Sequence, residues 1–444
     1  MNISSLIGHV VELLKLSEQS SQPLDRISST FFRERHYLGA KDRRFISEHL
    51  YNIVRHRRLA EALLERLVEE FPNFSELDDR YLRYISLYVI YTGAVEQQDK
   101  SPNELQSLIP SSYWSTHFPN INLSDTLSWV QKNRSLEFLP DDRVIRLGVK
   151  YSFQDWMVRE WIADDGELLL AALNSPGPIT LRVNTMKVTR EECRLRLRAE
   201  GVETEPTKFS PAGLVAAKRF NAQACESFKD GWFEFQDEGS QMVSLIVHPA
   251  PENIIIDACA GAGGKSLHLA ELMKDRGEII AVDVDHRRLQ ELQQRANRAG
   301  LHSIKTIQKE MFQPENFFGK ADIVLVDAPC SGVGTIRRNP SLKWSVSESL
   351  VEHHSEQQLD LLQENARYVK QGGRLIYVTC SLFKKENELV VEQFLGSEMG
   401  SNFAIDERRA VGDLLIEPHG GYYTLYPHRH QTDGFFIAPL KRLS

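Results

Sequence analysis

The second half of the chain alternates short apolar runs with segments of helical length, and this alternation restricts its fold more than any other feature. The apolar runs are NIIIDACAG, GEIIAVDVD, SIKTIQKE, ADIVLVDAPC and GRLIYVTCSL. A continuous apolar run is typical of a strand that is buried on both faces. Helical segments such as KSLHLAELMKD and HRRLQELQQRANRAG separate the runs. The pattern predicts an α/β domain over residues 239–444, built on a doubly wound parallel sheet.

Polar and reactive side chains follow several of these predicted strands. In a doubly wound sheet, ligands bind at the carboxyl ends of the strands. The residues that the sequence places there are Asp257, Asp283, Asp327, Cys330 and Cys380. We therefore expect these five residues to surround one site.

A glycine-rich loop, DACAGAGGKS, connects the first of these strands to a helix. Gly261, Gly263 and Gly264 allow a tight turn and a close approach of the backbone to a ligand. The amino terminus of the helix that follows favours an electron-rich ligand. These features predict a nucleotide-like ligand without naming it.

Three ligands are compatible with the loop. A dinucleotide site requires G-x-G-x-x-G, and the spacing here is G-x-G-G. The loop of a nucleoside triphosphatase fits CAGAGGKS except at Cys259, which replaces the first glycine, and IVLVDAP imitates the magnesium-binding strand of such enzymes. The third ligand is S-adenosylmethionine, whose ribose hydroxyls require an acid at the end of the next strand. Asp283 is in that position, and Asp285 is the better candidate for the cap of the following helix, so we favour the methyl donor.

Two of the five cysteines, Cys330 and Cys380, follow neighbouring strands at the ligand-binding edge. The chain contains no C-x-x-C pair, so a thiolate zinc site is not expected. Either thiol alone is compatible with simple packing in the core. Two thiols in equivalent positions favour a reactive role, because carbon 5 of a pyrimidine becomes nucleophilic only after a group such as a thiolate adds to carbon 6. Asp327 can then hold the N3 edge of the pyrimidine, or serve as a supporting acid.

The first half of the chain has a different pattern. Residues 1–145 show apolar spacing of three and four and predict a helical bundle, in which residues 31–58 hold eight Lys or Arg and three acids. That basic stretch is either a solvated helix face or an RNA contact. Residues 146–238 predict a small mixed α+β domain.

The net charge of -8 excludes an overall positive coat, and no apolar run is long enough to cross a membrane. We expect a cytoplasmic, monomeric protein without membrane contact.

The blocks DACAGAGGK, AVDVD, VDAPCSGVGTIRRNP and YVTCSL, in this order, resemble the Sun/Fmu-type RNA (cytosine-5) methyltransferases. Upstream, FQDEGSQMV resembles the start of that catalytic domain, and LRVNT resembles the small RNA-binding domain before it. Downstream, TDGFFIAPLKR resembles the closing strands. The basic helical stretch resembles the NusB-like domain of the bacterial members. The resemblance implies a Rossmann-like methyltransferase sheet preceded by a helical NusB-like domain and a small α+β RNA-binding domain.

The resemblance also implies roles for individual residues. Cys380 corresponds to the nucleophile that bonds to carbon 6, and Cys330 to the thiol that assists release of the methylated RNA. Asp327 and Lys265 complete the implied catalytic set. The implied contacts of the cofactor are Cys259, Ala260, Gly261, Ala262, Gly263, Gly264, Lys265, Asp283, Glu310 and Asp327.

Two departures from the family pattern affect the cofactor loop. Gly261 and Ala262 stand where the family has alanine and proline, which is expected to loosen the loop. Glu310 stands where the family has an aspartate, so its contact with the adenine side is in question. Neither change removes a reacting group.

The sequence thus predicts an S-adenosylmethionine-dependent enzyme that forms 5-methylcytosine in RNA, with ribosomal RNA as the expected substrate. Arg337, Arg338 and Lys343 are candidates for phosphate contacts, or are ordinary surface charges. The alternatives are a P-loop-like nucleoside triphosphatase, a methyltransferase for protein or small molecules, and a non-catalytic RNA-binding assembly factor.

Overall fold

The 444-residue chain is described by a computed structural model. The described residues are 1–20, 22–71, 80–96, 104–105, 108–163, 165–406 and 416–443. They divide into two compact units. Unit 1 comprises Met1–Ser175 and Ile336–Val346, and unit 2 comprises Pro176–Thr335 and Ser347–Ser444.

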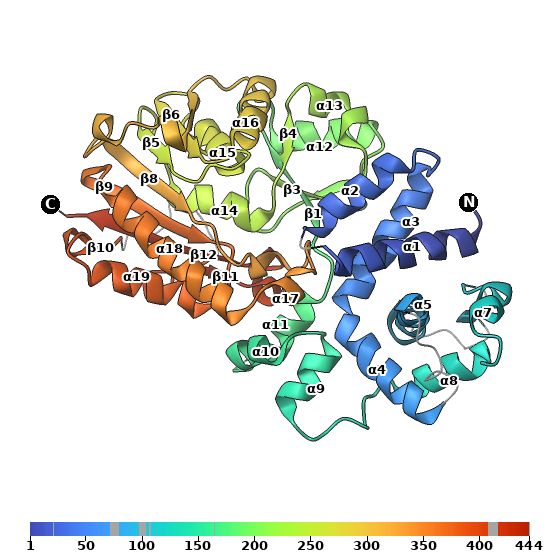
Figure 1. Cartoon of the computed structure of the whole chain (residues 1–444). Helices are drawn as coiled ribbons and strands as arrows, with labels where there is room; N and C mark the ends of the chain where they lie inside the picture. The colour runs from blue at the N-terminus through green and yellow to red at the C-terminus, as the bar shows by residue number, and fades with distance from the viewer. Residues whose placement is uncertain are drawn as a thin grey trace. The chain divides into compact units, whose positions relative to one another are not determined.

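The described secondary structure of unit 1 is helical, as the sequence predicts for residues 1–145, whereas the sequence predicts residues 146–175 to be in the small α+β domain (Figure 1). Its helices pack through apolar side chains spaced by three and four, among them Ile7, Val10, Leu50 and Leu63. The helices are α1 (Ile3–Glu18), α2 (Leu24–Glu34), α3 (Ala40–Arg55), α4 (Arg57–Glu70), α5 (Arg80–Tyr91) with the π-helix η2 (Thr92–Glu96), α7 (Ser111–His117), α8 (Leu123–Asn133), α9 (Arg143–Lys150), α10 (Asp155–Trp161), α11 (Gly166–Leu173) and α17 (Leu342–Ser345).

The basic stretch at residues 31–58 is largely neutralised within unit 1. Four of its arginines form ion pairs with acids of the same unit, and Arg55 is buried. The paired residues are Arg35 with Glu12, Arg44 with Glu48, Arg57 with Glu18 and Glu61, and Arg58 with Asp155. These contacts give the stretch a structural use inside the helical unit.

The segment 336–346 comes from the second half of the sequence but packs inside unit 1. Lys343 is fully buried there, and its ammonium donates to the backbone carbonyls of Arg55 and Tyr151, each at 2.9 Å. The same ammonium lies 4.0 Å from the centre of the Phe153 ring. The prediction that Lys343 contacts RNA phosphate is therefore wrong, and so is the alternative of an ordinary surface charge. Carbonyl oxygens accept from its nitrogen in the interior, and burial and the charge of Arg55 hold its pKa well below the ordinary value.

The first part of unit 2 is a small α+β layer with the strand order β2-β3-β1-β4, all antiparallel. Its strands are β1 (Ile179–Val183), β2 (Thr204–Pro206), β3 (Gly213–Ala216) and β4 (Phe233–Phe235). Its helices are α12 (Arg190–Ala199), η3 (Ala222–Ala224) and α13 (Glu226–Lys229). Leu181, Leu197 and Phe233 form part of its core. This layer agrees with the small α+β fold that the sequence predicts.

The remainder of unit 2 contains an eight-stranded sheet with the order β10-β12-β9-β8-β5-β6-β7, in which β11 also pairs with β12. The pairs among β5 to β9 are parallel, and those that involve β12 are antiparallel. The strands are β5 (Ile254–Asp257), β6 (Glu278–Asp283), β7 (Ile304–Gln308), β8 (Ala321–Asp327), β9 (Val369–Thr379), β10 (Phe403–Ile405), β11 (Tyr423–Leu425) and β12 (Phe435–Arg442). The strand order reverses between β5 and β8, which creates a crevice at the carboxyl ends of these strands.

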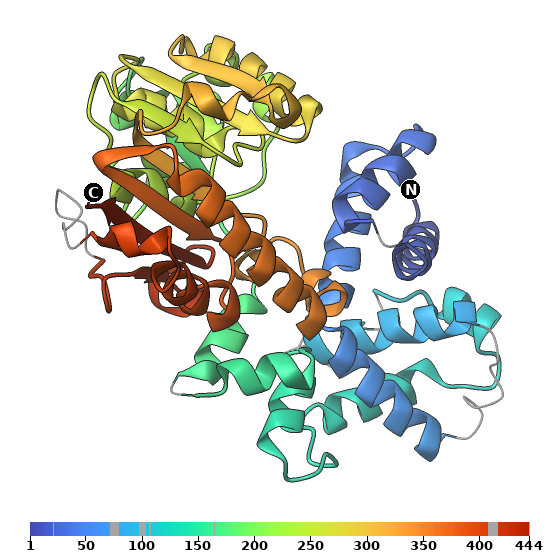
Figure 2. The ribbon, with the colours of Figure 1, turned by 60° about the vertical axis from the view of Figure 1, so that its left-hand side comes forward.

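Helices cover both faces of this sheet (Figures 1 and 2). Successive strand residues therefore enter different cores: Ile255 packs with α14, α15 and α16, and Ile256 packs with α18 and α19. The helices are α14 (Glu238–Val247), α15 (Gly264–Leu272), α16 (His286–Ala299), α18 (Glu348–Ala366), α19 (Glu388–Leu395) and α20 (Pro427–His430), with short 3-10 turns η4 (Lys309–Met311), η5 (Pro314–Asn316), η6 (Val333–Thr335), η7 (Lys384–Glu386) and η8 (Gly400–Asn402). Burial on both faces explains the continuous apolar runs and confirms the doubly wound fold.

The division by contacts differs from the three predicted domains. The predicted boundary at residue 145 falls within α9, and contacts do not separate the small sheet from the large one near residue 238. The boundaries 1–145, 146–238 and 239–444 stay predictions. None of the described helices has both the length and the apolar character needed to cross a lipid bilayer.

A buried ion pair joins the small sheet to the large one within unit 2. Arg182 of β1 contacts Glu271 of α15 through two bonds, of 2.8 and 3.2 Å, and its side chain is 0% exposed. The same guanidinium donates to the carbonyl of Gly264 at 2.9 Å and to the side chain of Gln236. Because Gly264 is the first residue of α15, this arginine holds the start of that helix.

We predict that Arg182→Met lowers the free energy of unfolding by about 3–5 kcal/mol, because it leaves a buried carboxylate without its partner. Arg194→Met is the matched control, since Arg194 pairs with Glu191 on the surface and its loss should lower the free energy of unfolding far less. Urea unfolding followed by circular dichroism measures both values. Equal losses in the two variants would contradict the role of the buried pair.

Candidate functional site

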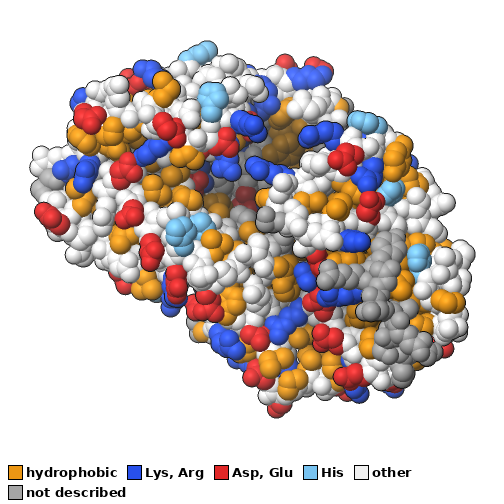
Figure 3. All heavy atoms as spheres, viewed as in Figure 1, with side chains coloured by type: hydrophobic (Ala, Val, Ile, Leu, Met, Phe, Trp, Pro, Cys, Tyr) orange, Lys and Arg blue, Asp and Glu red, His pale blue; other side chains and the backbone are white. Residues whose placement is uncertain are grey.

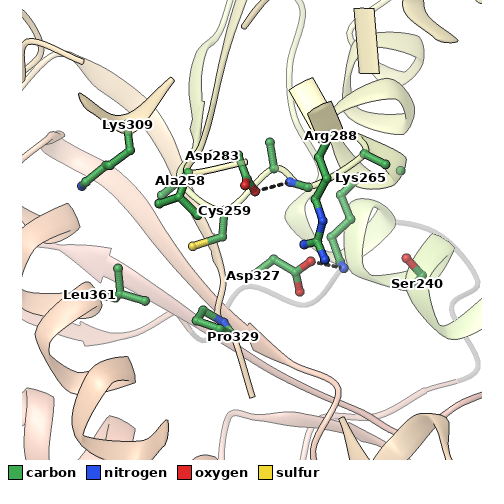
Figure 4. Close-up of a pocket in the computed structure, with 15 residues that line it drawn as sticks. Ser240, Ala258, Cys259, Lys265, Asp283, Arg288, Lys309, Asp327, Pro329 and Leu361 are labelled. Atoms are coloured by element: carbon green, nitrogen blue, oxygen red, sulfur yellow. Dashed lines mark hydrogen bonds and ion pairs between the residues drawn. The ribbon is translucent and has the colours of Figure 1, made fainter. Parts of the chain in front are cut away.

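A pocket of about 470 Å³ lies at the carboxyl ends of β5, β6 and β8 (Figure 4). The glycine loop forms one wall, and acids that end two strands face it. Its lining residues are Ser240, Ala258, Cys259, Ala260, Gly261, Ala262, Gly264, Lys265, Asp283, Val284, Arg288, Lys309, Asp327, Pro329 and Leu361. The pocket thus lies at the reversal of strand order, where the sequence predicts a ligand.

The glycine loop is held by its backbone conformation. Gly263 has a φ of 83°, and a Cβ atom there would lie 1.9 Å from a methyl carbon of Leu292, so only glycine fits. Gly261 has a φ of 54°, and a Cβ atom there would meet no atom within 4 Å. The loop is also tied at Ala262, whose carbonyl accepts a 2.6 Å bond from Arg295. These contacts show how the loop is fixed without the alanine and proline that the family pattern has.

Asp283 ends β6 and faces the same loop. Its carboxylate accepts the Gly261 N–H at 2.7 Å and the Asp285 N–H at 2.8 Å. Asp285 is the cap of α16 and accepts from Arg287 N–H at 2.9 Å, as the sequence predicts. A carboxylate has about four acceptor positions, so Asp283 retains capacity for the two hydroxyls of a ribose. The open space at Gly261 and this acid together fit a nucleoside that lies against the loop.

Lys265 and Asp327 form an ion pair of 2.6 Å inside the pocket, visible as a dashed line in Figure 4. Burial acts to lower the pKa of Lys265, but the negative charge of Asp327 and its hydrogen bond outweigh burial and leave this pKa raised. The lysine therefore stays charged. It is close enough to Cys380 to interact with it electrostatically, whereas Lys384 and Lys385, which are nearer to Cys380 in the sequence, are both exposed.

The two cysteines that the sequence singles out come together. Cys330 follows β8 and Cys380 follows β9, and their sulfur atoms lie 3.3 Å apart. The hydrogen bond to Cys380 and burial raise the pKa of Cys330 well above its ordinary value, so Cys330 keeps its proton. Neither thiol is among the lining residues of the pocket, but Pro329 and Lys265 are, so the pair lies at its edge.

Of the remaining predicted cofactor contacts, some line the pocket and two do not. Cys259, Ala260, Gly261, Ala262, Gly264 and Lys265 line the pocket, whereas Gly263 supports the turn from behind, against Leu292. Glu310 lies in η4, is exposed, and is not a lining residue, although its neighbour Lys309 is. An adenine contact of Glu310 therefore stays a prediction. Arg288 and Lys309 are lining residues that the sequence reasoning missed, because charged residues after a strand are common.

Comparison with known proteins identifies the family. A family model described as 16S rRNA methyltransferase RsmB/F matches residues 244–441, and a ferredoxin-like domain of RsmF/B-like methyltransferases matches residues 153–223. A Synechocystis protein named probable ribosomal RNA small subunit methyltransferase B is 32% identical over 416 residues, which cover 92% of this chain and 93% of that protein. The chain belongs to the RsmB/F methyltransferase family. The resemblance deduced from the sequence motifs is confirmed.

Other relatives agree with this assignment. A Bacillus subtilis protein with the same description is 34% identical over 315 residues, which cover 68% of this chain and 69% of that protein. A mouse protein named 28S rRNA (cytosine-C(5))-methyltransferase is 32% identical over 67% of this chain and 40% of its own length. The crystal structure of a protein named PH0851 covers 100% of this chain and 99% of its own, with 28% identity and a TM-score of 0.75.

Membership of the RsmB/F family makes this protein an RNA methyltransferase whose methyl donor is S-adenosylmethionine. The glycine loop and Asp283 fit the nucleoside part of that donor, as described above. When bound, the donor supplies an electrophilic methyl group. The nucleoside triphosphatase that the loop sequence also allowed is not the chemistry of this family.

We predict that Asp283→Ala weakens binding of S-adenosylhomocysteine by at least about tenfold, because two ribose hydroxyls and the Gly261 N–H lose their acceptor. Asp285→Ala, which removes the cap of α16 and a surface ion pair of 3.9 Å with Arg288, should change the dissociation constant by less than about threefold. Isothermal titration calorimetry measures both. Equal weakening would mean that helix capping, and not ribose contact, is what the binding requires.

Asp257 is a buried acid behind the pocket, and burial raises its pKa from 3.8 to about 7. Its carboxylate accepts the Ser266 hydroxyl at 2.6 Å. Between pH 4 and 7 the folded protein holds a proton that the unfolded chain has released. This group therefore makes the folded state less stable as the pH rises through that range.

We predict that Asp257→Asn gains stability relative to the original protein as the pH rises from 4 to 7, by about 1.4 kcal/mol per pH unit. The asparagine cannot ionise, and its carbonyl can still accept from Ser266. Urea unfolding of the ligand-free protein at several pH values measures the difference. A difference that does not change with pH would show that Asp257 is not the titrating group.

Proposed function

We propose that the protein methylates carbon 5 of cytosine in ribosomal RNA, with the small-subunit RNA as substrate, through a covalent bond to Cys380. The observation that carries this proposal is the pair of sulfur atoms 3.3 Å apart beside the Lys265–Asp327 ion pair, at the edge of the cofactor pocket. Methyl transfer to a nitrogen or oxygen atom needs no thiol. Transfer to carbon 5 of cytosine needs a nucleophile at carbon 6.

In the proposed reaction, the Cys380 thiolate adds to carbon 6 and its electron pair moves into the ring. Lys265 is close enough to interact electrostatically with Cys380 and stabilises the thiolate before it attacks. As the ring takes up the electron pair, N3 gains a proton from water, and Asp327 faces this edge of the cytosine and accepts a hydrogen bond from the new N3–H. Carbon 5 then takes the methyl group from the sulfonium of the donor, which leaves as a neutral thioether.

Release requires that the carbon 5 proton passes to water, that N3 gives its added proton back to water, and that the bond between sulfur and carbon 6 breaks, which restores the ring double bond. Cys380 then departs as a thiolate. Cys330 keeps its proton because its pKa is raised, and its sulfur lies 3.3 Å from that of Cys380. Its S–H group can therefore donate to the departing thiolate, which explains why release would depend on a second thiol.

The target cytosine must leave its stack before carbon 6 can reach Cys380. Acidic and basic side chains are mixed over the face shown in Figure 3, in accord with a net charge of -8. Binding to RNA then depends on local contacts and not on overall charge. We propose an unpaired segment of ribosomal RNA as the substrate, and a monomer as the acting form.

The test uses S-adenosylmethionine labelled in its methyl group and undermethylated small-subunit and large-subunit ribosomal RNA. Nuclease digestion and mass spectrometry should find the label on carbon 5 of cytosine in the small-subunit RNA. Label only in the large-subunit RNA would correct the substrate. RNA binding without label transfer would instead support the non-catalytic assembly factor.

We predict that Cys330→Ala accumulates a covalent protein–RNA adduct, because attack still occurs and release is slowed. Cys380→Ala should form no adduct and should lose methyl transfer by at least about 1,000-fold, because the nucleophile is gone. Denaturing gel electrophoresis with labelled RNA detects the adduct. The opposite pattern would show that the two thiols have exchanged roles.

A further inference from the structure

Glu386 is a buried carboxylate that the proposed chemistry leaves unused. It ends η7, six residues after Cys380, and its side chain is 0% exposed. A buried carboxylate is costly unless hydrogen bonds replace the water that it loses. The groups that donate to Glu386 are neutral: two from Ser331, one from Ser381 and one from Gln358.

These donors come from both cysteine loops. Ser331 follows Cys330, and it donates its N–H at 2.7 Å to one carboxylate oxygen and its hydroxyl at 2.5 Å to the other. Ser381 follows Cys380, and its hydroxyl donates to the second of these oxygens. Each reactive thiol is therefore one residue away from a group that the same carboxylate holds.

Glu386 is itself fixed to the sheet and to α18. The Tyr377 hydroxyl, on β9, donates to the Glu386 carbonyl at 2.5 Å, and its oxygen lies 3.0 Å from the side-chain oxygen of Gln358. Gln358, on α18, donates to the Pro329 carbonyl at 2.9 Å and to the Glu386 carboxylate at 3.3 Å. Pro329 directly precedes Cys330, so this second route leads to the same loop. Glu386 is thus held through its backbone by β9 and through its carboxylate by α18.

A carboxylate suits this position because hydrogen bonds to an ionised acceptor are about twice as strong as neutral ones. Three such bonds reach residues adjacent to the two cysteines. They restrain the loops toward each other more than apolar packing of the same volume would. The separation of the two sulfur atoms is therefore set by Glu386 as well as by the strand ends.

We propose that Glu386 is a positioning residue, which holds the loops of Cys330 and Cys380 so that attack and release are carried out at one carbon atom in turn. This inference rests on the proposed function, in which both thiols act on the same cytosine. Glu386 touches neither substrate nor donor in this account. It acts through Ser331 and Ser381.

The kinetic test is Glu386→Ala in the full-length protein. The expected result is a fall in kcat of at least about tenfold, with KM for RNA and for the donor changed by less than about threefold. The reason is that, without this carboxylate, the two loops hold the thiols in the wrong positions even when the substrate is bound. A rise in KM at unchanged kcat would overturn the proposal, because it would assign Glu386 to binding.

A second measurement reports thiol geometry without RNA. Diamide takes two electrons and two protons from a pair of neighbouring thiols, which become a disulfide, and is itself reduced to a hydrazine. Formation of the disulfide between Cys330 and Cys380, followed by mass spectrometry of peptides, should be at least about fivefold slower in Glu386→Ala. An unchanged or faster rate in the folded variant would overturn the proposal.

Two further variants separate positioning from general damage. Glu386→Gln keeps the shape of the side chain. Its amide oxygen can accept from the Ser331 N–H, and its NH₂ group can donate to the hydroxyls of Ser331 and Ser381. Both kcat and the rate of disulfide formation should therefore recover to within about threefold of the original values. This variant also serves if Glu386→Ala does not fold. Glu238→Ala removes another buried carboxylate, which accepts from Ser210 N–H at 2.8 Å away from the cysteines. Equal effects of Glu238→Ala and Glu386→Ala on the disulfide rate would contradict a specific role.

The two proposals fail in different ways. If the unmodified protein places no methyl group on cytosine carbon 5, the proposed function is wrong, and the disulfide rate still reports whether Glu386 sets the thiol geometry. If methylation occurs and Glu386→Ala changes neither kcat nor the disulfide rate, the proposed function stands and the positioning role is wrong.

Discussion

The buried contact between Arg182 and Glu271 is the interaction on which the arrangement of unit 2 depends. It joins β1 of the small sheet to α15, the helix that begins with the glycine loop, and it holds the Gly264 carbonyl directly. The position of the loop determines where a nucleoside can lie against Asp283. A surface ion pair could not provide this restraint, because water and salt would screen it. The small layer therefore supports the methyl-donor site, in addition to any part it plays in RNA binding.

A second buried carboxylate, Glu386, has a comparable place on the other side of the pocket. There the restraint acts on the loops that follow β8 and β9, through Ser331 and Ser381. Cofactor loop and thiol loops are thus each tied to rigid elements by charged groups that are removed from solvent. Lys265 lies between the two regions, paired with Asp327 and close to Cys380. Such restraint suits chemistry in which two thiols and a methyl donor must meet one ring.

Much of the fold was predictable because each local pattern agreed with the global one. Apolar runs predicted strands buried on both faces, and the acids Asp283 and Asp327 lie at strand ends where the alternation placed them. Lys343 shows the limit of this reasoning. A lysine in a basic, turn-forming segment is ordinarily exposed, but here the chain carries it into unit 1, where backbone carbonyls accept hydrogen bonds from its nitrogen. Those carbonyls belong to residues 288 and 192 positions away in the sequence, so no local pattern could reveal them.

The sequence by itself determined the fold class, the cofactor loop and the two candidate thiols, because apolar periodicity, glycine spacing and the D-A-P-C-S-G and T-C-S blocks are all local features. Only the tertiary structure decided that the sulfur atoms lie 3.3 Å apart, that Lys265 is the cation close to Cys380, and that Glu386 reaches both cysteine loops. The physical reason is that these relations join different strands, and their distances follow from how the parallel sheet brings the strand ends together.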